Sequence, residues 1–299
     1  MTNFYELDEV GQSLAMQGLA QRALAEWSLE GSELELIKYR ENAVFKVQTG
    51  AGERYALRIH RHAYHSDAEL RSELQWIAAL DAAGIDVPGV VPTSKGDLFA
   101  LVEVPEVPES RQVDLFAWVD GEQLGSVEAG VGDSASVTDT YRTIGQLAAR
   151  LHNQATAWNP PAGFTRHAWN VDGLVGEEPF WGHFWELASL TSEERELLLR
   201  ARARVAVDLA AYASDPANAG LYSLIHADFV AENLMVDGAT VRLIDFDDAG
   251  FGWHLFELAT ALYFEMEEEY YPQAYQALVD GYRQHRPLSD GQLAQLPLF

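Results

Sequence analysis

The sequence changes its periodicity near the middle, and this change constrains the fold more than any other feature. Between residues 34 and 119, short apolar runs alternate with turns, which is typical of antiparallel strands. After Gly121, apolar stripes with helical spacing dominate, as in residues 139–158 and 192–213. Strands and helices segregated in this way predict an α+β fold. We expect a small antiparallel-sheet N-lobe over residues 1–117 and a mostly helical C-lobe over residues 118–299.

The first lobe contains a predicted β-hairpin and one predicted helix. Residues 44–47 and 55–59 form apolar runs on either side of a turn with two glycines, which indicates two paired strands. Ser66 is a typical helix cap, and Leu70, Leu74, Ile77 and Leu80 follow it at helical spacing. A second strand pair is expected near residues 98–104 and 112–119.

The composition excludes several classes of function. The chain of 299 residues has no Cys, which removes disulfides, thiolate catalysis and cysteine-ligated zinc. A net charge of -26 makes nucleic acids and anionic membranes poor partners. With neither a signal peptide nor a long apolar segment, a cytoplasmic protein is expected. Solubility is the favoured explanation of the acidic charge, and attraction of a cationic acceptor is the alternative. The oligomeric state is left open.

Polar residues with metal-ligand chemistry gather between residues 225 and 248. A loop after the apolar run Leu224-Ile225 carries His226, Asp228 and Asn233, and a predicted hairpin then ends at Asp245. Carboxylate and amide oxygens are ligands that suit Mg²⁺, which completes its shell with phosphate and water. The sequence therefore predicts a site for a magnesium nucleotide.

The spacing of these residues matches the phosphoryl-transfer pattern H-R-D-x-x-x-x-N followed by D-F-G, with Ala227 in place of Arg and Asp247 in place of Gly. By this template Asp228 accepts or orients the proton of the attacking hydroxyl. Asn233 and Asp245 hold the metal on the phosphates. His226 is expected to fix the loop by hydrogen bonding and to take no part in proton transfer.

These motifs resemble the aminoglycoside phosphotransferase and choline kinase-like family, and the resemblance extends over most of the chain. It implies a bilobal protein-kinase-like fold with ATP and Mg²⁺ as cofactors. Residues 41–47 are similar to the family's nucleotide-covering turn, so Asn42 is implied to approach the phosphates. The segment that contains Phe116 and Trp118 resembles the interlobe hinge beside the nucleotide.

The chain also departs from the family pattern in the first lobe and in a late helix. Arg58 stands where kinases usually place the phosphate-binding Lys, and Glu73 is its expected partner, with a surface ion pair as the alternative interpretation. Arg stays charged and binds phosphate through a planar fork, so it is not equivalent to Lys. The covering turn has no glycine-rich run. Glu257 replaces the more usual Asp.

The short stretch after Asp245 favours a small acceptor over a peptide. A helix begins near Trp253, which leaves no room for the activation segment of protein kinases. Asp247 is a candidate for contact with an amino group of the acceptor. Trp181 and Trp185 have two interpretations, packing or aromatic contact with the acceptor.

The leading hypothesis is an ATP-dependent phosphotransferase that acts on a hydroxyl of a small molecule such as an amino alcohol, amino sugar or hydroxy amino acid. Two alternatives remain, an atypical Ser/Thr protein kinase and a non-catalytic nucleotide-binding regulator suggested by Arg58. The sequence does not distinguish ATP from GTP, identify the acceptor, or separate a role in antibiotic resistance from a metabolic one.

Overall fold

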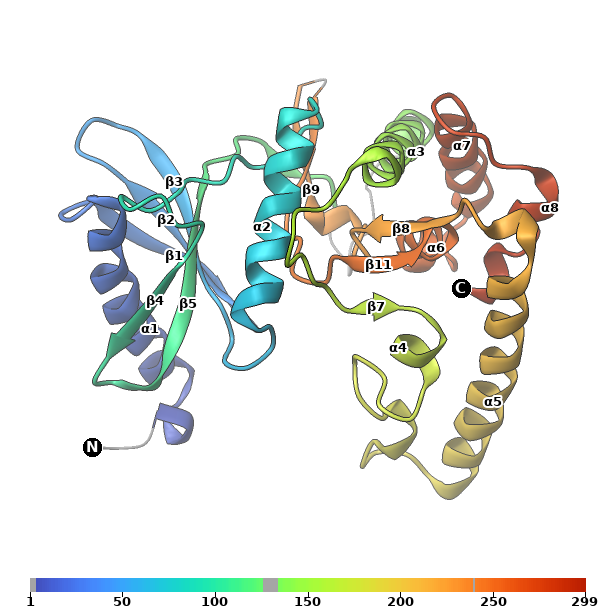
Figure 1. Ribbon diagram of the computed structural model, residues 1–299, viewed down its shortest axis with the longest axis horizontal. Coiled ribbons are helices and arrows are strands. Elements are labelled where there is room, and N and C mark those ends of the chain that lie inside the picture. Colours follow the sequence, from blue (N-terminus) through green and yellow to red (C-terminus); the bar gives the residue numbers. More distant parts are fainter. Residues whose placement is uncertain (1–3, 126–133, 239) are drawn as a thin grey trace. The chain divides into compact units, whose positions relative to one another are not determined.

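The computed structural model describes residues 4–125, 134–238 and 240–299, and the chain folds into two compact units (Figure 1). The first unit comprises residues up to Asp120 together with Pro161–Thr165, and the second comprises Gly121–Pro160 and Arg166–Phe299. No sequence pattern indicated that Pro161–Thr165 belongs to the first unit. The assignment of nucleotide and acceptor roles to residues 1–117 and 118–299 remains a proposal.

The first unit is built on a five-stranded antiparallel sheet with the order β1-β2-β3-β5-β4. The predicted hairpin is confirmed, since β2 and β3 pair around a turn in which the Thr49 N–H donates to the Glu53 carbonyl at 2.9 Å. The second predicted strand pair is also present, as β4 and β5, although β5 begins at Val107, earlier than the predicted start near residue 112. The strands are β1 (Glu33–Tyr39), β2 (Ala43–Gln48), β3 (Arg54–Ile59), β4 (Ala100–Val104) and β5 (Val107–Ala117).

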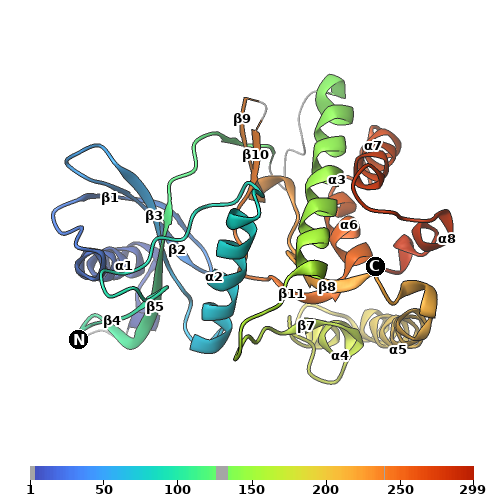
Figure 2. The ribbon, with the colours of Figure 1, turned by 45° about the horizontal axis from the view of Figure 1, so that its top comes forward.

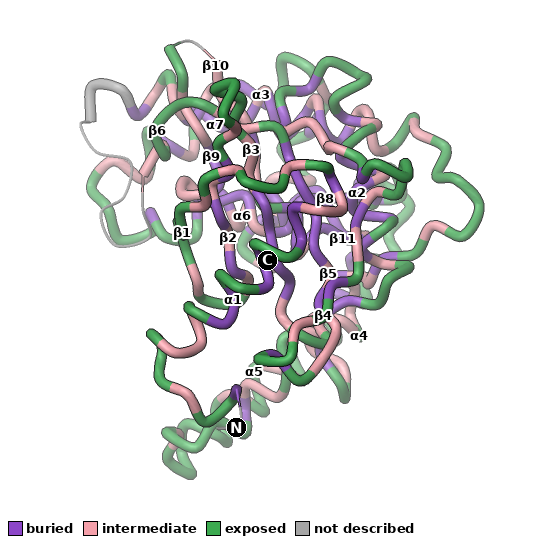
Figure 3. The backbone as a smooth tube through the Cα atoms, turned by 90° about the vertical axis from the view of Figure 1, so that its left-hand side faces the viewer, coloured by how far each residue is buried: buried purple, intermediate pink, exposed green. Residues whose placement is uncertain are grey.

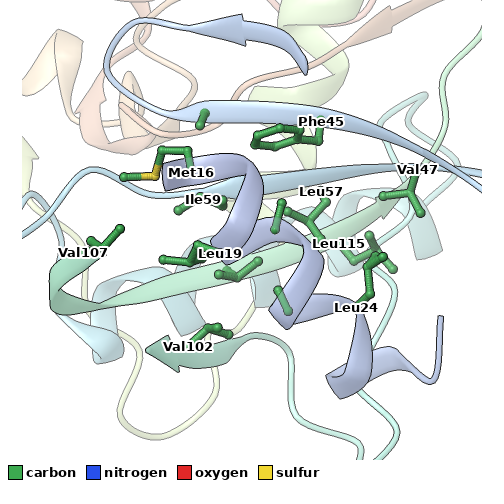
Figure 4. Packing of buried hydrophobic residues seen from close by; sticks show 14 of the residues in the cluster. Met16, Leu19, Leu24, Phe45, Val47, Leu57, Ile59, Val102, Val107 and Leu115 are labelled. Carbon is green, nitrogen blue, oxygen red and sulfur yellow. The ribbon is translucent and has the colours of Figure 1, made fainter. Parts of the chain in front are cut away.

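One face of this sheet packs against helix α1 (Glu9–Ala23), which the sequence analysis did not predict. Strand register places Phe45, Leu57 and Leu115 side by side, and all three are fully buried. Figure 4 shows these residues around α1 together with Met16, Leu19 and Leu24. Alternation along each strand sends the neighbouring side chains, Arg58 and Asp114 among them, to the opposite face.

Helix α2 (Asp67–Ala82) begins where the sequence predicted. The Ser66 hydroxyl accepts from the Glu69 N–H at 3.3 Å, and the Ser66 N–H donates to the Glu69 carboxylate at 2.9 Å. This reciprocal capping box satisfies donors that the first helical turn leaves unpaired. Glu73, in the second turn of this helix, is a buried side chain.

The second unit contains the long helices. Helices α3 (Ser134–Ala157) and α7 (Tyr271–Arg283) lie side by side in Figure 2. Their backbones approach closely at two glycines, because a Cβ on Gly145 would lie 2.0 Å from the Leu278 carbonyl oxygen and one on Gly281 would lie 2.0 Å from that of Arg142. The other helices of this unit are α4 (Val171–Val175), α5 (Ser192–Ser214), α6 (His254–Tyr263) and α8 (Asp290–Leu293).

Two small three-stranded sheets of the second unit carry the polar loops. One has the order β7-β11-β8 and the other the order β10-β9-β6. Their strands are β6 (Glu122–Gln123), β7 (Ala168–Trp169), β8 (Tyr222–Ile225), β9 (Leu234–Asp237), β10 (Thr240–Leu243) and β11 (Gly250–Trp253). Figure 3 shows β8 as a largely buried strand, so its end delivers a loop from inside the unit. Among the described residues, no helix combines the length and apolar character needed to cross a bilayer.

Candidate functional site

The loop after β8 is held in an unusual backbone conformation by one buried carboxylate. Ala227 has φ of 67°, in the left-handed region that costs a non-glycine residue about 1–3 kcal/mol. The N–H groups of His226 and Ala227 donate to the two oxygens of Glu257 at 3.0 and 2.7 Å. These two hydrogen bonds offset the strain and fix the direction in which the chain leaves β8.

Glu257 is a positioning residue to which the sequence analysis assigned no role. It lies on α6 and is completely buried. Burial raises the pKa of its carboxyl, although the two N–H donors and the neighbouring His226 act in the opposite direction. An acid placed between Phe256 and Leu258 in an apolar helix was the signal that could have identified it.

His226 joins the two polar loops through its ring. Its Nδ1 accepts from the Asp228 N–H at 3.3 Å, so its Nε2 carries the proton and donates to the Ile244 carbonyl at 3.0 Å. Burial lowers the pKa of the ring below its ordinary value. The neutral imidazole, through its two hydrogen bonds, aligns Asp228 with the end of β10.

Asn233 orients Asp228 and turns its own amide oxygen away from that carboxylate. Its Nδ2 donates to the Asp228 Oδ2 at 2.6 Å and to the Asp228 carbonyl at 2.9 Å. The amide oxygen accepts no hydrogen bond within the described ranges. The backbone carbonyl of Asn233 accepts from the Ile244 N–H at 2.9 Å. Asp245 is the next residue after Ile244, so this hydrogen bond brings the backbone of Asp245 near Asn233.

Asp245 is exposed and has φ of 64°, so the backbone turns sharply as it leaves β10. An unengaged amide oxygen together with an exposed carboxylate is a donor set that fits a hard divalent cation. The chemistry of these residues therefore fits a nucleotide bound with a divalent cation, and Asn233 and Asp245 are the residues that would hold the cation.

The loop that follows Asp245 is held by its backbone. Arg166 donates from Nε to the Ala249 carbonyl at 2.5 Å and from Nη2 to the Asp247 carbonyl at 2.6 Å. The indole of Trp169 donates to the Asp248 carbonyl at 2.8 Å. Asp247 itself is only 9% exposed. Sequence reasoning gave Arg166 no part in this loop, because a contact across 81 residues leaves no local pattern.

The two tryptophans proposed for acceptor contact lie in different environments. Trp185 is 7% exposed, and the Arg202 guanidinium lies 4.0 Å from the centroid of its ring. Trp181 is 60% exposed, with its ring 4.5 Å from that of the buried Trp169. Trp185 therefore fits the interpretation that it packs within the protein. Trp181 presents the more accessible aromatic surface.

Arg58 in the first unit forms a buried ionic cluster with more partners than the sequence indicated. Its Nη2 donates to Glu73 at 2.7 Å and to Asp114 at 2.7 Å, and its Nε donates to the second Asp114 oxygen at 3.2 Å. His60 bonds to Asp114 at 3.0 Å. The ion pair between Arg58 and Glu73 is buried, which rules out the alternative of a surface ion pair. Asp114 was missed because it pairs across the sheet, 56 residues from Arg58.

Asp114 is charged despite complete burial. Burial by itself would raise the pKa of this carboxyl, but Arg58 and His60 outweigh that effect and lower it. Arg58 is thus held in one orientation by two carboxylates and lies 5.2 Å from the ring centroid of Phe116.

The remaining predicted nucleotide residues also lie in the first unit. Asn42 accepts from the Arg61 N–H at 3.0 Å and so shapes the turn between β1 and β2. Trp118 follows β5, with the Lys46 ammonium 5.5 Å from its ring. Nucleotide contact by Asn42, Phe116 and Trp118 remains a prediction.

Two comparisons with known sequences find related proteins. The sequence model of the phosphotransferase enzyme family, APH, matches residues 34–290. An uncharacterized protein of Deinococcus radiodurans is 30% identical over 307 residues, which cover 99% of this chain and 81% of that relative.

Solved structures show the same fold. A microcompartment-associated aminopropanol kinase superposes with a TM-score of 0.80 at 33% identity, covering 94% of this chain and 85% of that protein. Amicoumacin kinase hAmiN, solved with AMP-PNP, Ca²⁺ and Ami, superposes with a TM-score of 0.77 at 19% identity, covering 97% and 84% of the two chains. The second likeness shows the fold alone.

Proposed function

Because the chain belongs to the phosphotransferase enzyme family, we propose that it transfers the γ-phosphate of ATP to a hydroxyl of a small molecule. The observation that carries this proposal is the orientation of Asn233, whose amide nitrogen is bonded to Asp228 while its oxygen is left for a cation. This arrangement separates two roles. The Asn233 amide nitrogen orients the Asp228 carboxylate toward the acceptor, while the Asn233 amide oxygen and Asp245 are the proposed ligands of the cation.

In the proposed reaction, Asp228 accepts a hydrogen bond from the acceptor hydroxyl and takes its proton as the new O–P bond forms. The bond between the γ-phosphorus and the oxygen that leaves with ADP breaks in the same step. The backbone held by Glu257 and the ring of His226 keep Asp228 in place. Positioning of this kind supplies much of the catalysis in phosphoryl transfer.

Bound ATP with Mg²⁺ would supply the phosphoryl group and the charge that neutralises it. Asn233 and Asp245 would hold the cation, and Arg58 would add a permanent positive charge for the phosphates. Two buried carboxylates hold the Arg58 side chain, so its cost of ordering is met by the fold and not by the nucleotide.

We infer that the acceptor is an amino alcohol or a related small hydroxyl compound. The similar structure at 33% identity is named an aminopropanol kinase, which is of this class. A net charge of -26 would attract a cationic acceptor, and Asp247 with the exposed face of Trp181 are the residues proposed to meet its amino group. Cytoplasmic function fits the use of ATP.

The experiment compares Asp228→Asn with the native chain in acceptor-dependent ADP release. The acceptors are 1-amino-2-propanol, ethanolamine, homoserine and an aminoglycoside. We expect the variant to lose about 10²- to 10⁴-fold in kcat because the proton acceptor is removed. Its affinity for AMP-PNP should stay close to the native value.

Asp237→Asn is the matched control, because Asp237 is an exposed acid at the end of β9. Native-level turnover by Asp228→Asn would refute the role of this carboxylate. Phosphorylation of added proteins without any reaction of the alcohols would support the protein-kinase alternative. Tight AMP-PNP binding without any turnover would support the regulator alternative.

A further inference from the structure

The first unit has a half-open cavity of about 250 Å³ on the face of the sheet that packs against α1. Its walls include Phe4, Met16, Tyr39, Ile59, Arg61 and Arg111. Met16 and Ile59 also belong to the hydrophobic cluster in Figure 4, so the cavity lies at an edge of that cluster. Arg58 and Asp114 project from the opposite face of the same sheet, so the cavity does not include the proposed phosphate-binding guanidinium, although His60, which bonds to Asp114, lines part of it.

Arg111 places a guanidinium where the strand pattern calls for an apolar side chain. Along β5 it shares a face with Val113 and Leu115, which are both fully buried. Its strand partner Val102 is buried as well. Arg111 is only 5% exposed, so its charge is removed from bulk water.

The hydrogen bonds of Arg111 are long for a buried charge. Its Nη2 lies 3.2 Å from the Tyr5 hydroxyl and 3.4 Å from Glu109, and its Nη1 lies 3.4 Å from the His60 carbonyl. Charge-assisted bonds to carboxylates are usually about 2.7–2.9 Å long. The Nε is buried and has no hydrogen-bond partner among the described residues. A buried donor in this state is costly unless a ligand engages it.

A second arginine lines the same cavity. Arg61 continues the face of Ile59 beyond the end of β3, and its guanidinium lies 3.1 Å from the centroid of the Tyr64 ring. Its Nε is also buried without a partner among the described residues. Glu41 is the one acidic residue in the cavity lining. In a chain with a net charge of -26, two arginines on one small cavity form a locally positive surface.

We propose that this cavity binds a small organic carboxylate. The ligand's two oxygens pair with the Nε and Nη2 edge of Arg111, a planar fork that matches a carboxylate. Its apolar body contacts Phe4, Met16 and Ile59. A monoanion suits the site better than a phosphate dianion, because Glu109 lies 3.4 Å from the same guanidinium and Glu41 lines the wall.

The test measures benzoate binding to the full chain by calorimetry in the absence of nucleotide. Benzamide, which has the same shape without the charge, and inorganic phosphate are the comparison probes. Because a hydrogen bond to a charged group is worth about 1.5–3 kcal/mol, benzoate should bind about 10-fold or more tightly than benzamide. Benzoate should also bind more tightly than phosphate.

Three variants locate the site. Arg111→Lys keeps the charge but loses the fork, and we expect benzoate affinity to fall about 10-fold. Glu41→Gln removes the acid from the lining and should strengthen benzoate binding several-fold, and it tests the cavity even if Arg111→Lys does not fold. Arg22→Ala, an exposed arginine on α1, is the control and should bind benzoate as the native chain does.

Equal affinity for benzoate and benzamide would overturn the proposal, as would tighter binding of phosphate. An unchanged benzoate affinity in both Arg111→Lys and Glu41→Gln would do the same. None of these measurements involves ATP or an acceptor, so the outcome is independent of the proposed phosphotransfer.

Discussion

The two units of this protein each bury a carboxyl group, and they do so in opposite ways. In the first unit, Asp114 is held by Arg58 and His60, and its pKa is lowered. In the second, Glu257 accepts from backbone N–H groups beside neutral histidines, and its pKa is raised by burial. We call Arg58, His60, Glu73 and Asp114 the Arg58 cluster. We call Glu257, together with the backbone donors His226 and Ala227, the Glu257 cluster. Burial is complete in both cases, so the permanent cation decides the sign of the shift.

The Glu257 cluster extends into a row of buried imidazoles. His152 lies 3.5 Å from Glu257 through Nε2, and its Nδ1 bonds to the Tyr282 hydroxyl at 2.9 Å. Its ring stacks on that of His254 with centroids 3.9 Å apart. Burial holds the pKa of both histidines well below the ordinary value, and Arg286 acts in the same direction. The imidazoles of this row are therefore neutral at neutral pH.

The comparison predicts the largest loss of stability where the permanent cation is removed. Arg58→Met leaves Glu73 and Asp114 buried without their shared counter-ion, and we expect about 3–5 kcal/mol less free energy of unfolding. Arg58→Lys keeps the charge and should lose less. Urea unfolding at pH 7 measures both.

Arg204→Met serves as the control, since that arginine is exposed and pairs with Asp208 within α5. It should unfold at nearly the native urea concentration. If Arg58→Met also unfolded at the native midpoint, the Arg58 cluster would not be a structural feature of the first unit.

A smaller loss is expected in the Glu257 cluster. Glu257→Gln keeps the shape but leaves an amide nitrogen facing one buried N–H donor, which costs about 1–3 kcal/mol. Under the proposed function, kcat should fall more than the affinity for AMP-PNP, because the loop that carries Asp228 loses one of its two supports. Steady-state kinetics and urea unfolding are the measurements.

Glu267→Gln, an exposed acid just after α6, is the matched control. A Glu257→Gln chain with native stability and native kcat would show that the hydrogen bonds to His226 and Ala227 do not position the loop.

The smallest effect per group is expected on mild acidification. His152 and His254 have folded pKa values below the unfolded value of about 6.5, so the stability they contribute is complete above that pH and is lost below it. Between pH 7 and 6 each costs about 0.7 kcal/mol. Glu257 opposes this loss, because its raised pKa lets the folded state bind a proton first.

Asp114 behaves differently because its pKa is lowered. Its contribution is present above the unfolded pKa of about 3.9 and disappears only as the pH falls below it. The urea midpoint should therefore fall from pH 7 to pH 6, and Glu257→Gln should show a steeper fall. A midpoint that stays constant or rises would contradict the neutral state of these histidines.

Local patterns predicted much of the fold. The β2–β3 hairpin and helices α2 and α5 were expected because turn residues and capping boxes act within a few positions of the chain. Helix α1 was not expected. Its buried face consists largely of alanines with Met16 and Leu19, so it has little apolar contrast until the sheet covers it.

The sequence by itself determined which residues share a loop. Asp228 and Asn233 are five positions apart, so their hydrogen bond needs only a tight local turn. Tertiary structure alone decided what holds that loop and what charges Arg58 meets. Glu257 reaches it from 30 residues away and Asp114 reaches Arg58 from 56, by strand register and helix packing. Such pairings follow from how apolar faces are buried together, and burial is a property of the whole fold that no short stretch of sequence specifies.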